Sequence, residues 1–249
     1  MHPGISHVFQ SAAFRFGHTL IPPGMYRRDG QCNFQRAPDG SPALRLCSSW
    51  WDAQGTVTGG ALEDLLRGMS SQISEKEDAT LCSDIRNKLF GPMDFSRRDL
   101  AALNIMRGRD SGLADYNTVR SFYGLGRVAN WSDINPALYR EEPELFHRLE
   151  QVYGDYGMNN IDLYIGGMLE SSNGPGPLFR RIIKDQFERI RDADRFWFEN
   201  TDNKIFSPEE IESIKAITLW DVIVNSTAVG PEEIQKKVFF WMESDPCQQ

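Results

Sequence analysis

The sequence has no apolar run near the roughly 20 residues that a membrane-spanning helix requires, and it has no long basic block. Residues 1–20 also lack the charged start, the purely apolar segment and the small-residue cleavage site of a secretory signal. A net charge of −8 without basic clusters excludes the electrostatic footprint of a nucleic-acid-binding protein. We expect a chain that is by itself neither inserted in a membrane nor targeted.

The four cysteines lack the close pairing of a zinc site or of a CxxC redox motif. They are Cys32, Cys47, Cys82 and Cys247. Disulfides or free thiols remain as the alternatives. The segment from Arg28 to Gly60 is rich in Gly, Pro, Asp and Ser, which predicts a long irregular loop that a bridge between Cys32 and Cys47 could hold.

Two glycosylation sequons begin at Asn130 and Asn225. Each is a weak signal, because such short motifs arise often by chance. Together with the even number of cysteines, they favour an oxidising, extracellular compartment.

Helical patterns dominate the 249 residues, and a hydrophobic content of 40% is enough for a sizeable core. Capping signals predict one helix beginning after Ser96, with Asp99 three residues on, and another after Ser207. The other predicted helices cover residues 5–20, 61–73, 78–89, 116–123, 143–153 and 178–190. No stretch shows convincing strand alternation, so the predicted fold class is mainly α.

Polar side chains occupy faces of two helices where apolar ones are expected. Arg15 and His18 share a face of the first helix, and Asn104 and Arg107 belong to the inner stripe of the helix after Ser96. An imidazole that binds a metal through Nε2 commonly donates its Nδ1 proton to an acceptor, which the Asn104 carbonyl could provide. A haem would supply iron for His18 and carboxylates for Arg15 and Arg107.

Structural explanations of the same residues stay open. His18 could be a core histidine bonded to a backbone carbonyl. Arg107 and Arg109 could be basic residues at a helix C-terminus, with Asp110 as a local ion partner. Spacing alone does not decide between these alternatives and a haem site.

Several separated motifs resemble the animal haem peroxidases, a mainly α-helical family, in the same order along most of the chain. "FRFGHTLIPP" is similar to the family's proximal-histidine helix, and "DLAALNIMRGRDSGLADYN" to its Asn and RGRD segment. "NNIDLYIGGMLES" and "RDADRFWFEN" resemble later helices. Within the family, the N-terminal segment, "DINPAL" and "IFSPEE" are most similar to the peroxidase-like ectodomain of dual oxidases.

The resemblance implies that residues 1–249 form the proximal half of one animal haem peroxidase-like domain. It implies His18 as the proximal iron ligand and Asn104 as the acceptor that orients its other nitrogen. It implies Arg15 and Arg107 as partners of the haem propionates. Two departures from the family pattern are Ser111, where many members have histidine, and Ala114, where proline is common.

The family's distal histidine and arginine, its acidic groups that bond haem and its calcium loop belong to an amino-terminal half with no counterpart in this sequence. The resemblance therefore implies a partial domain that lacks catalytic residues and is inactive alone, while the intact domain would bind calcium as well as haem. Peroxide cleavage needs a base and a fixed cation, which that half would provide.

The expected function of the intact protein is peroxidase chemistry: hydrogen peroxide is reduced while a phenolic or halide donor is oxidised. The resemblance also implies a membrane NADPH oxidase module that produces the peroxide, a location on the extracellular face of a membrane or outside the cell, and a part in the response to oxidative stress. The alternative is a catalytically silent domain that keeps the scaffold for interactions. No nucleic-acid partner is expected.

Overall fold

The computed structural model describes residues 2–37, 40–51, 60–91, 93–241 and 246–247. Contacts divide the chain into two compact units, each built from three separate segments. Unit 1 comprises Met1–Ile21, Glu75–Cys82 and Arg97–Asp194, and unit 2 comprises Pro22–Ser74, Ser83–Ser96 and Arg195–Gln249. The single partial domain stays a prediction.

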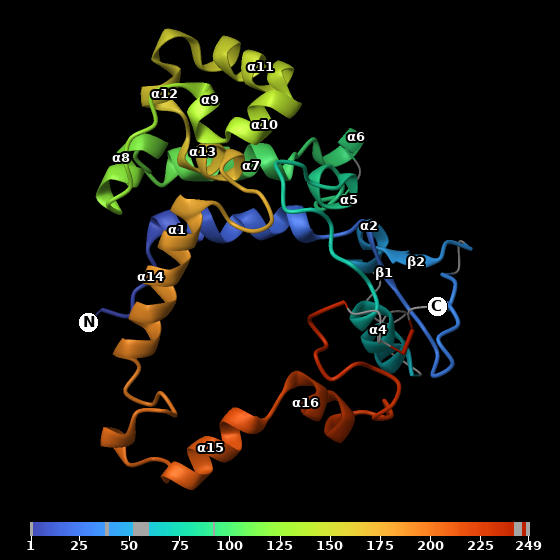
Figure 1. Ribbon diagram of the computed structural model, residues 1–249. Helices are drawn as coiled ribbons and strands as arrows, with labels where there is room; N and C mark the ends of the chain where they lie inside the picture. The colour runs from blue at the N-terminus through green and yellow to red at the C-terminus, as the bar shows by residue number, and fades with distance from the viewer. Residues whose placement is uncertain (1, 38–39, 52–59, 92, 242–245, 248–249) are drawn as a thin grey trace. The chain divides into compact units, whose positions relative to one another are not determined.

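Unit 1 is helical throughout its regular structure. Its elements are α1 (His7–Ser11), η1 (Ala13–Leu20), α7 (Leu100–Asp110), α8 (Tyr116–Phe122), α9 (Trp131–Ile134), α10 (Pro136–Glu141), α11 (Pro143–Tyr153), η2 (Gly154–Tyr156), α12 (Gly157–Asn160), α13 (Leu163–Leu169) and α14 (Pro177–Ala193). Helix α13 contacts α7, α8, α14 and η1 (Figure 1). The mainly α fold class is confirmed.

Two adjacent glycines allow α13 to pack at this central position. A Cβ on Gly166 would lie 2.3 Å from the Tyr116 ring, and one on Gly167 would lie 2.1 Å from the Phe179 ring. Both rings are fully buried in the core of unit 1. Because such contacts are far inside van der Waals distance, any larger residue at either glycine would force α13 away from its neighbours.

A buried carboxylate joins α13 to two other helices of unit 1. Glu170, at the end of α13, is 6% exposed. It accepts hydrogen bonds from the Tyr116 hydroxyl (2.5 Å) and the Leu178 amide (2.8 Å), and it forms an ion pair with Arg120. Burial, followed by the Glu170 charge, raises the pKa of Tyr116, so the phenol stays protonated and donates.

Unit 2 contains a small antiparallel sheet and several helices. Its elements are β1 (Gly24–Tyr26), β2 (Ala43–Arg45), α2 (Leu46–Ser49), α4 (Ala61–Ser70), α5 (Ser83–Arg86), α6 (Met93–Ser96), η3 (Thr201–Asn203), α15 (Pro208–Ala216) and α16 (Leu219–Ser226). In the sheet, Met25 pairs with Leu44. A Cβ on Gly68 of α4 would lie 1.9 Å from the Tyr26 carbonyl oxygen, so glycine permits the close approach of α4 to β1.

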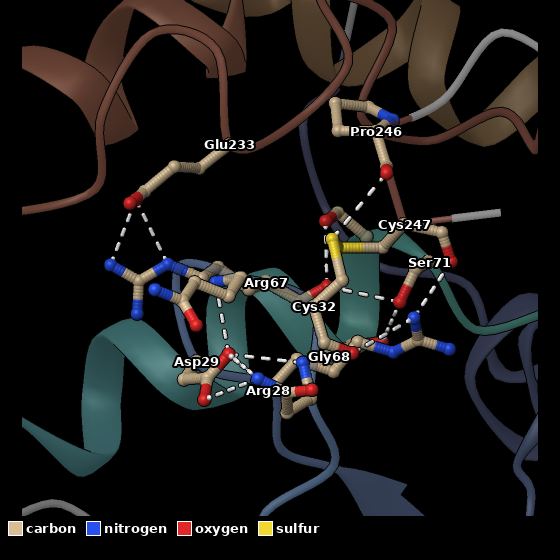
Figure 2. Close-up of a disulfide and its surroundings, with 12 residues drawn as sticks. Arg28, Asp29, Cys32, Arg67, Gly68, Ser71, Glu233, Pro246 and Cys247 are labelled. Atoms are coloured by element: carbon tan, nitrogen blue, oxygen red, sulfur yellow. Dashed lines mark hydrogen bonds and ion pairs between the residues drawn. A yellow bond between two sulfur atoms is a disulfide. The ribbon is translucent and has the colours of Figure 1, made fainter. Parts of the chain in front are cut away.

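A disulfide joins Cys32 to Cys247 across 215 residues of sequence in unit 2. The predicted bridge between Cys32 and Cys47 is therefore wrong, and Cys47 and Cys82 are free thiols. Figure 2 shows the disulfide beside Arg28, whose guanidinium donates to the Cys247 carbonyl at 2.7 Å. Loop composition could not identify the partner, because contact between distant segments decides which cysteines meet.

Most of the longer predicted helices are confirmed. The structure has helices at Ala61–Ser70, Tyr116–Phe122, Pro143–Tyr153 and Pro177–Ala193. The Ser207 cap is confirmed in detail, because its hydroxyl accepts from the Glu210 amide while the Glu210 carboxylate accepts from the Ser207 amide.

Other helix predictions are corrected. Residues 5–20 form α1 and then a 3-10 helix, with a break at Ala12 (φ −135°, ψ −73°). The N-cap of α7 is Asp99, which accepts from the Ala102 amide, while Ser96 ends α6. Only Ser83–Arg86 of the predicted helix at 78–89 is helical. Strands β1 and β2 have three residues each, too few for an alternation pattern.

Within the part of the chain that the structure describes, no helix combines the length and the apolar character needed to cross a membrane.

Candidate functional site

Arg15 and His18 are carried by η1, whose position is fixed by small buried residues. A 3-10 helix has three residues per turn, so residues three apart lie on the same side. Arg15 and His18 have this spacing, and both are half-buried. Ala12 and Ala13 are completely buried, and Thr19 is 1% exposed, donating from its hydroxyl to the Phe16 carbonyl. The two polar side chains therefore start from an anchored backbone.

Asn104 faces inward from α7. The Asp99 cap starts this helix, and Leu100, Asn104 and Gly108 are its buried residues, spaced by four as one helical face requires. Asn104 is completely buried. A buried amide needs partners for its oxygen and its nitrogen, because an unsatisfied buried polar group costs about 1–3 kcal/mol.

Three side chains satisfy the Asn104 amide, all within unit 1. Arg15 Nη1 donates to Asn104 Oδ1 at 2.8 Å. Asn104 Nδ2 lies 3.0 Å from His18 Nδ1 and 3.1 Å from the Tyr164 hydroxyl, to which it donates. The structure thus joins three of the four predicted site residues in one hydrogen-bond network, with Asn104 at its centre.

The direction of these bonds differs from the predicted one. Asn104 was expected to offer its oxygen to the Nδ1 proton of His18. A guanidinium can only donate, so Arg15 requires the Asn104 oxygen on its own side, which leaves the amide nitrogen facing His18. Asn104 therefore donates to Nδ1, and a neutral His18 in this arrangement carries its proton on Nε2.

Burial and neighbouring charge keep His18 neutral. Burial lowers the pKa of His18 below its ordinary value, and the positive charge of Arg15 lowers it further. Burial and the Arg107 charge also lower the pKa of Arg15. No residue in the described ranges bonds to His18 Nε2, and none offers Arg15 a carboxylate. Besides Asn104, the one acceptor of Arg15 in the described part of the chain is the Gln10 carbonyl, at 3.0 Å.

Arg107 does not join this network through a bond. Its side chain is 56% exposed and pairs with Asp110 at 3.4 Å. The expectation that it belongs to the inner stripe is therefore corrected, since Arg107 lies on the exposed side of α7 with Met106 and Asp110. Arg107 remains close enough to Arg15 for their charges to interact, and its contact with a cofactor stays a prediction.

The comparison with protein families identifies the family of the chain. The family model described as "Animal haem peroxidase" matches residues 1–239. The chain belongs to the animal haem peroxidase family. The family implies haem as the cofactor of the intact domain. Among the described residues, no group of three or more His, Cys, Asp or Glu side chains could hold a metal ion by itself.

Several curated relatives of the chain are dual oxidases. The chain is 62% identical to "Dual oxidase" of Drosophila melanogaster over 249 residues, which is 100% of the chain and 16% of that protein. It is 47% identical to "Dual oxidase 1" of Caenorhabditis elegans, over 99% of the chain and 17% of that protein. This animal haem peroxidase chain thus spans about a sixth of the length of these relatives.

A solved structure supports the same fold. "Peroxidase A from Dictyostelium discoideum" superposes with a TM-score of 0.79 at 31% sequence identity, over 95% of this chain and 43% of that one. The helical architecture described above is therefore the architecture of a known peroxidase.

The residues present fit the cofactor that the family implies. Burial and the charge of Arg15 favour the neutral imidazole of His18, and its Nε2 has no described partner, so this nitrogen can bind an iron once its proton has moved to Nδ1. Arg15 is a half-buried cation without a described carboxylate partner, so a propionate would neutralise it. Arg15 thus has what a carboxylate-binding residue needs, and His18 offers an anchored imidazole whose Nε2 has no described partner.

Sequence analysis missed Tyr164, the third partner of Asn104. It lies in the "NNIDLYIGGMLES" segment, which was recognised without a role for any single residue. Its side chain is 4% exposed on α13, and burial raises its pKa, so it remains a neutral phenol. A tyrosine preceding two close-packed glycines was the available signal, but only the fold shows that it reaches Asn104.

Arg109, the other arginine of the RGRD motif, belongs to a second ion-pair cluster. Its guanidinium donates to both oxygens of Asp162, at 2.9 and 2.7 Å, and the Tyr153 hydroxyl donates to the same carboxylate at 2.6 Å. The Asp162 side chain is 14% exposed. The bonds from Arg109 and Tyr153 hold the pKa of Asp162 below its ordinary value, against the effect of burial.

Replacing Arg109 by alanine is expected to lower the free energy of unfolding by about 1–3 kcal/mol, because it leaves a poorly solvated carboxylate with one side-chain donor fewer. Urea unfolding monitored by circular dichroism measures this loss. Arg148→Ala is the control, since Arg148 is 69% exposed and pairs with Glu144 at 3.9 Å. Equal stability of the two variants would show that the Asp162 cluster contributes little.

Proposed function

We propose that this chain is the haem-binding proximal part of a peroxidase domain in a dual oxidase-like protein, with His18 as the axial ligand. The observation that carries the proposal is the network of Arg15, His18 and Asn104, which leaves His18 Nε2 without a described partner and Arg15 without a described carboxylate. Family membership and the similarity to dual oxidases support it.

Each residue would have a distinct part. When bound, haem supplies the redox-active iron at which hydrogen peroxide is reduced and a phenolic or halide donor is oxidised. His18 would bind through Nε2 with its proton on Nδ1, where the Asn104 side-chain oxygen would accept it and orient the ring. Arg15 and, from its exposed position, Arg107 bind carboxylates. The charge of Arg15 favours the neutral imidazole, which is the form that ligates metals.

The longer protein sets the context of the proposal. The dual oxidase relatives support an NADPH oxidase module that supplies peroxide, and we propose a site outside the cell or on the outer face of a membrane. The disulfide supports an oxidising compartment. The same proposal includes glycans at Asn130 and Asn225, which are both exposed. It also includes calcium in the intact domain and a role under oxidative stress.

Substitution of His18 by alanine tests the proposal directly. The wild-type chain mixed with haemin is expected to give the Soret spectrum of histidine-ligated haem, and His18→Ala is expected to lose that spectrum and to bind haemin about 100-fold more weakly or worse. His147→Ala is the matched control, because His147 is exposed on α11 and lies outside the network. Identical titrations of wild type and His18→Ala would refute the ligand assignment.

A catalytically silent interaction domain is the second candidate. The observation in its favour is that Arg15, His18 and Tyr164 already satisfy the buried Asn104 amide without a cofactor. Asn104→Leu separates the two candidates. A haem-binding domain would lose about 10–100-fold in haemin affinity in addition to stability, whereas a silent scaffold would lose only stability. Haemin titration and thermal unfolding of the same samples measure both quantities.

A further inference from the structure

The Asn104 amide lies between the Arg15 guanidinium, which can only donate hydrogen bonds, and the His18 ring, which can donate or accept them. We propose that Arg15 is a positioning residue that holds His18 in the tautomer unable to ligate iron, and that a carboxylate which draws Arg15 away releases Asn104 and His18 into the ligating arrangement. The inference rests on the proposed haem-binding function and adds to it a coupling between carboxylate binding and axial ligation.

The donors and acceptors fix the starting arrangement. Arg15 Nη1 lies 2.8 Å from Asn104 Oδ1, so the amide oxygen is held on that side. Asn104 Nδ2 then donates toward His18 Nδ1 at 3.0 Å. A nitrogen that accepts this bond has its lone pair occupied and carries no proton. The proton of the neutral ring is on Nε2, which is the atom an iron would have to bind.

Ligation through Nε2 requires the opposite arrangement. The proton must be on Nδ1 and needs an acceptor, which a half-turn of the Asn104 amide provides by bringing Oδ1 to His18. The same half-turn would place Nδ2 against Arg15, so that two donors face each other. The turn is therefore blocked for as long as Arg15 stays at 2.8 Å.

The third partner does not oppose the turn. The Tyr164 hydroxyl now accepts from Asn104 Nδ2 at 3.1 Å, but a hydroxyl can also donate, so it can bond to either end of the amide. Arg15 is thus the only partner of Asn104 among the described residues that discriminates between its two orientations. The exchange of tautomers conserves protons, because Nε2 releases one to solvent and Nδ1 takes one up.

Nitrogen NMR of the cofactor-free chain, labelled with 15N-histidine, tests the first half of the proposal. The chain has four histidines, and the His18 signals are assigned by their loss in His18→Gln. In the wild type we expect an unprotonated Nδ1 and a protonated Nε2 for His18. Arg15→Met is expected to shift the ring toward the form protonated at Nδ1, and Arg15→Lys, which keeps a cationic donor, is expected to retain the wild-type tautomer.

A second variant covers the case in which Arg15→Met does not fold. Asn104→Asp replaces the amide with two acceptor oxygens, so Arg15 and a His18 Nδ1 proton can both be bonded without any turn. We expect the His18 Nδ1 to be protonated in this variant with Arg15 still present. The proposal is overturned if wild-type His18 is protonated at Nδ1, or if folded Arg15→Met keeps the wild-type tautomer.

Haemin and its dimethyl ester test the coupling, since the ester has no carboxylate that could pair with Arg15. A simple ion pair predicts that Arg15→Met weakens haemin binding and leaves the ester unchanged. The proposal predicts in addition that Arg15→Met strengthens axial ligation of the ester, by about 10-fold or more if the block costs at least one hydrogen bond. Unchanged ligation of the ester in this variant would overturn the coupling.

These outcomes separate the inference from the proposed function. If the Soret spectrum is unchanged in His18→Ala, the proposed haem ligation by His18 fails. The tautomer of the cofactor-free chain then still shows whether Arg15 controls the His18 ring. If the spectrum depends on His18 but the His18 tautomer is unchanged in Arg15→Met, only the further inference fails.

Discussion

Replacing Glu170 by alanine is expected to lower the free energy of unfolding by about 3–5 kcal/mol, the loss typical of breaking a buried ion pair by removing one partner. Glu170 accepts from Tyr116 and from the Leu178 amide, and it neutralises Arg120, whose side chain is 15% exposed. Without the carboxylate, a largely buried cation and two donors lose their shared partner. Urea denaturation followed by intrinsic fluorescence measures the loss.

Two variants calibrate this result. Glu170→Gln keeps the shape and one acceptor oxygen but removes the charge, so an intermediate loss is expected. Glu144→Ala removes an acid that is 70% exposed, and it should stay within about 0.5 kcal/mol of the wild type. A loss below about 1 kcal/mol for Glu170→Ala would mean that Arg120 reaches water readily when the carboxylate is absent.

Loss of the disulfide is the second large expected effect. The double variant Cys32→Ser/Cys247→Ser opens a loop of 215 residues, for which the chain-entropy relation gives about 5 kcal/mol at most, with about 2–5 kcal/mol typical of measured cases. Because the bond ties two distant segments of unit 2, the loss should appear chiefly in that unit. Hydrogen exchange resolved by segment, with and without reductant, measures it.

The free thiol Cys82 provides the control. Cys82→Ser removes a half-buried sulfur that takes no part in a bridge, so it should change the free energy of unfolding by less than about 1 kcal/mol. Protection in unit 2 that is the same in the double variant and in Cys82→Ser would show that non-covalent contacts, such as the ion pair of Arg67 with Glu233, hold distant segments of this unit without the disulfide (Figure 2).

Local signals predicted the fold where one residue controls one helix end. Ser207 with Glu210 and the proline at position 143 each mark a helix start that the structure confirms. The start of α7 was wrong because Ser96 and Asp99 are both good caps at a spacing of three. Arg97, with a φ of +49°, separates α6 from α7, and an arginine side chain gives no signal for this left-handed backbone conformation.

The candidate site shows the same division between local and distant information. Helical spacing and residue chemistry brought Arg15, His18 and Asn104 together as a hypothesis, and the structure joins them by hydrogen bonds. The sequence could not show that Arg15 donates to the Asn104 oxygen, nor that the Tyr164 hydroxyl accepts from the Asn104 nitrogen. Those facts depend on how α7, α13 and η1 pack, which no single helix pattern specifies.

The order of segments in unit 1 also sets when the site can form during translation. His18 leaves the ribosome 86 residues before Asn104, with two excursions into unit 2 between them. At about 5–20 residues per second, the imidazole therefore waits roughly 4–17 s for its amide partner, and longer for Tyr164. A nascent chain stalled before residue 104 would expose His18 and Arg15 without their bonds to Asn104.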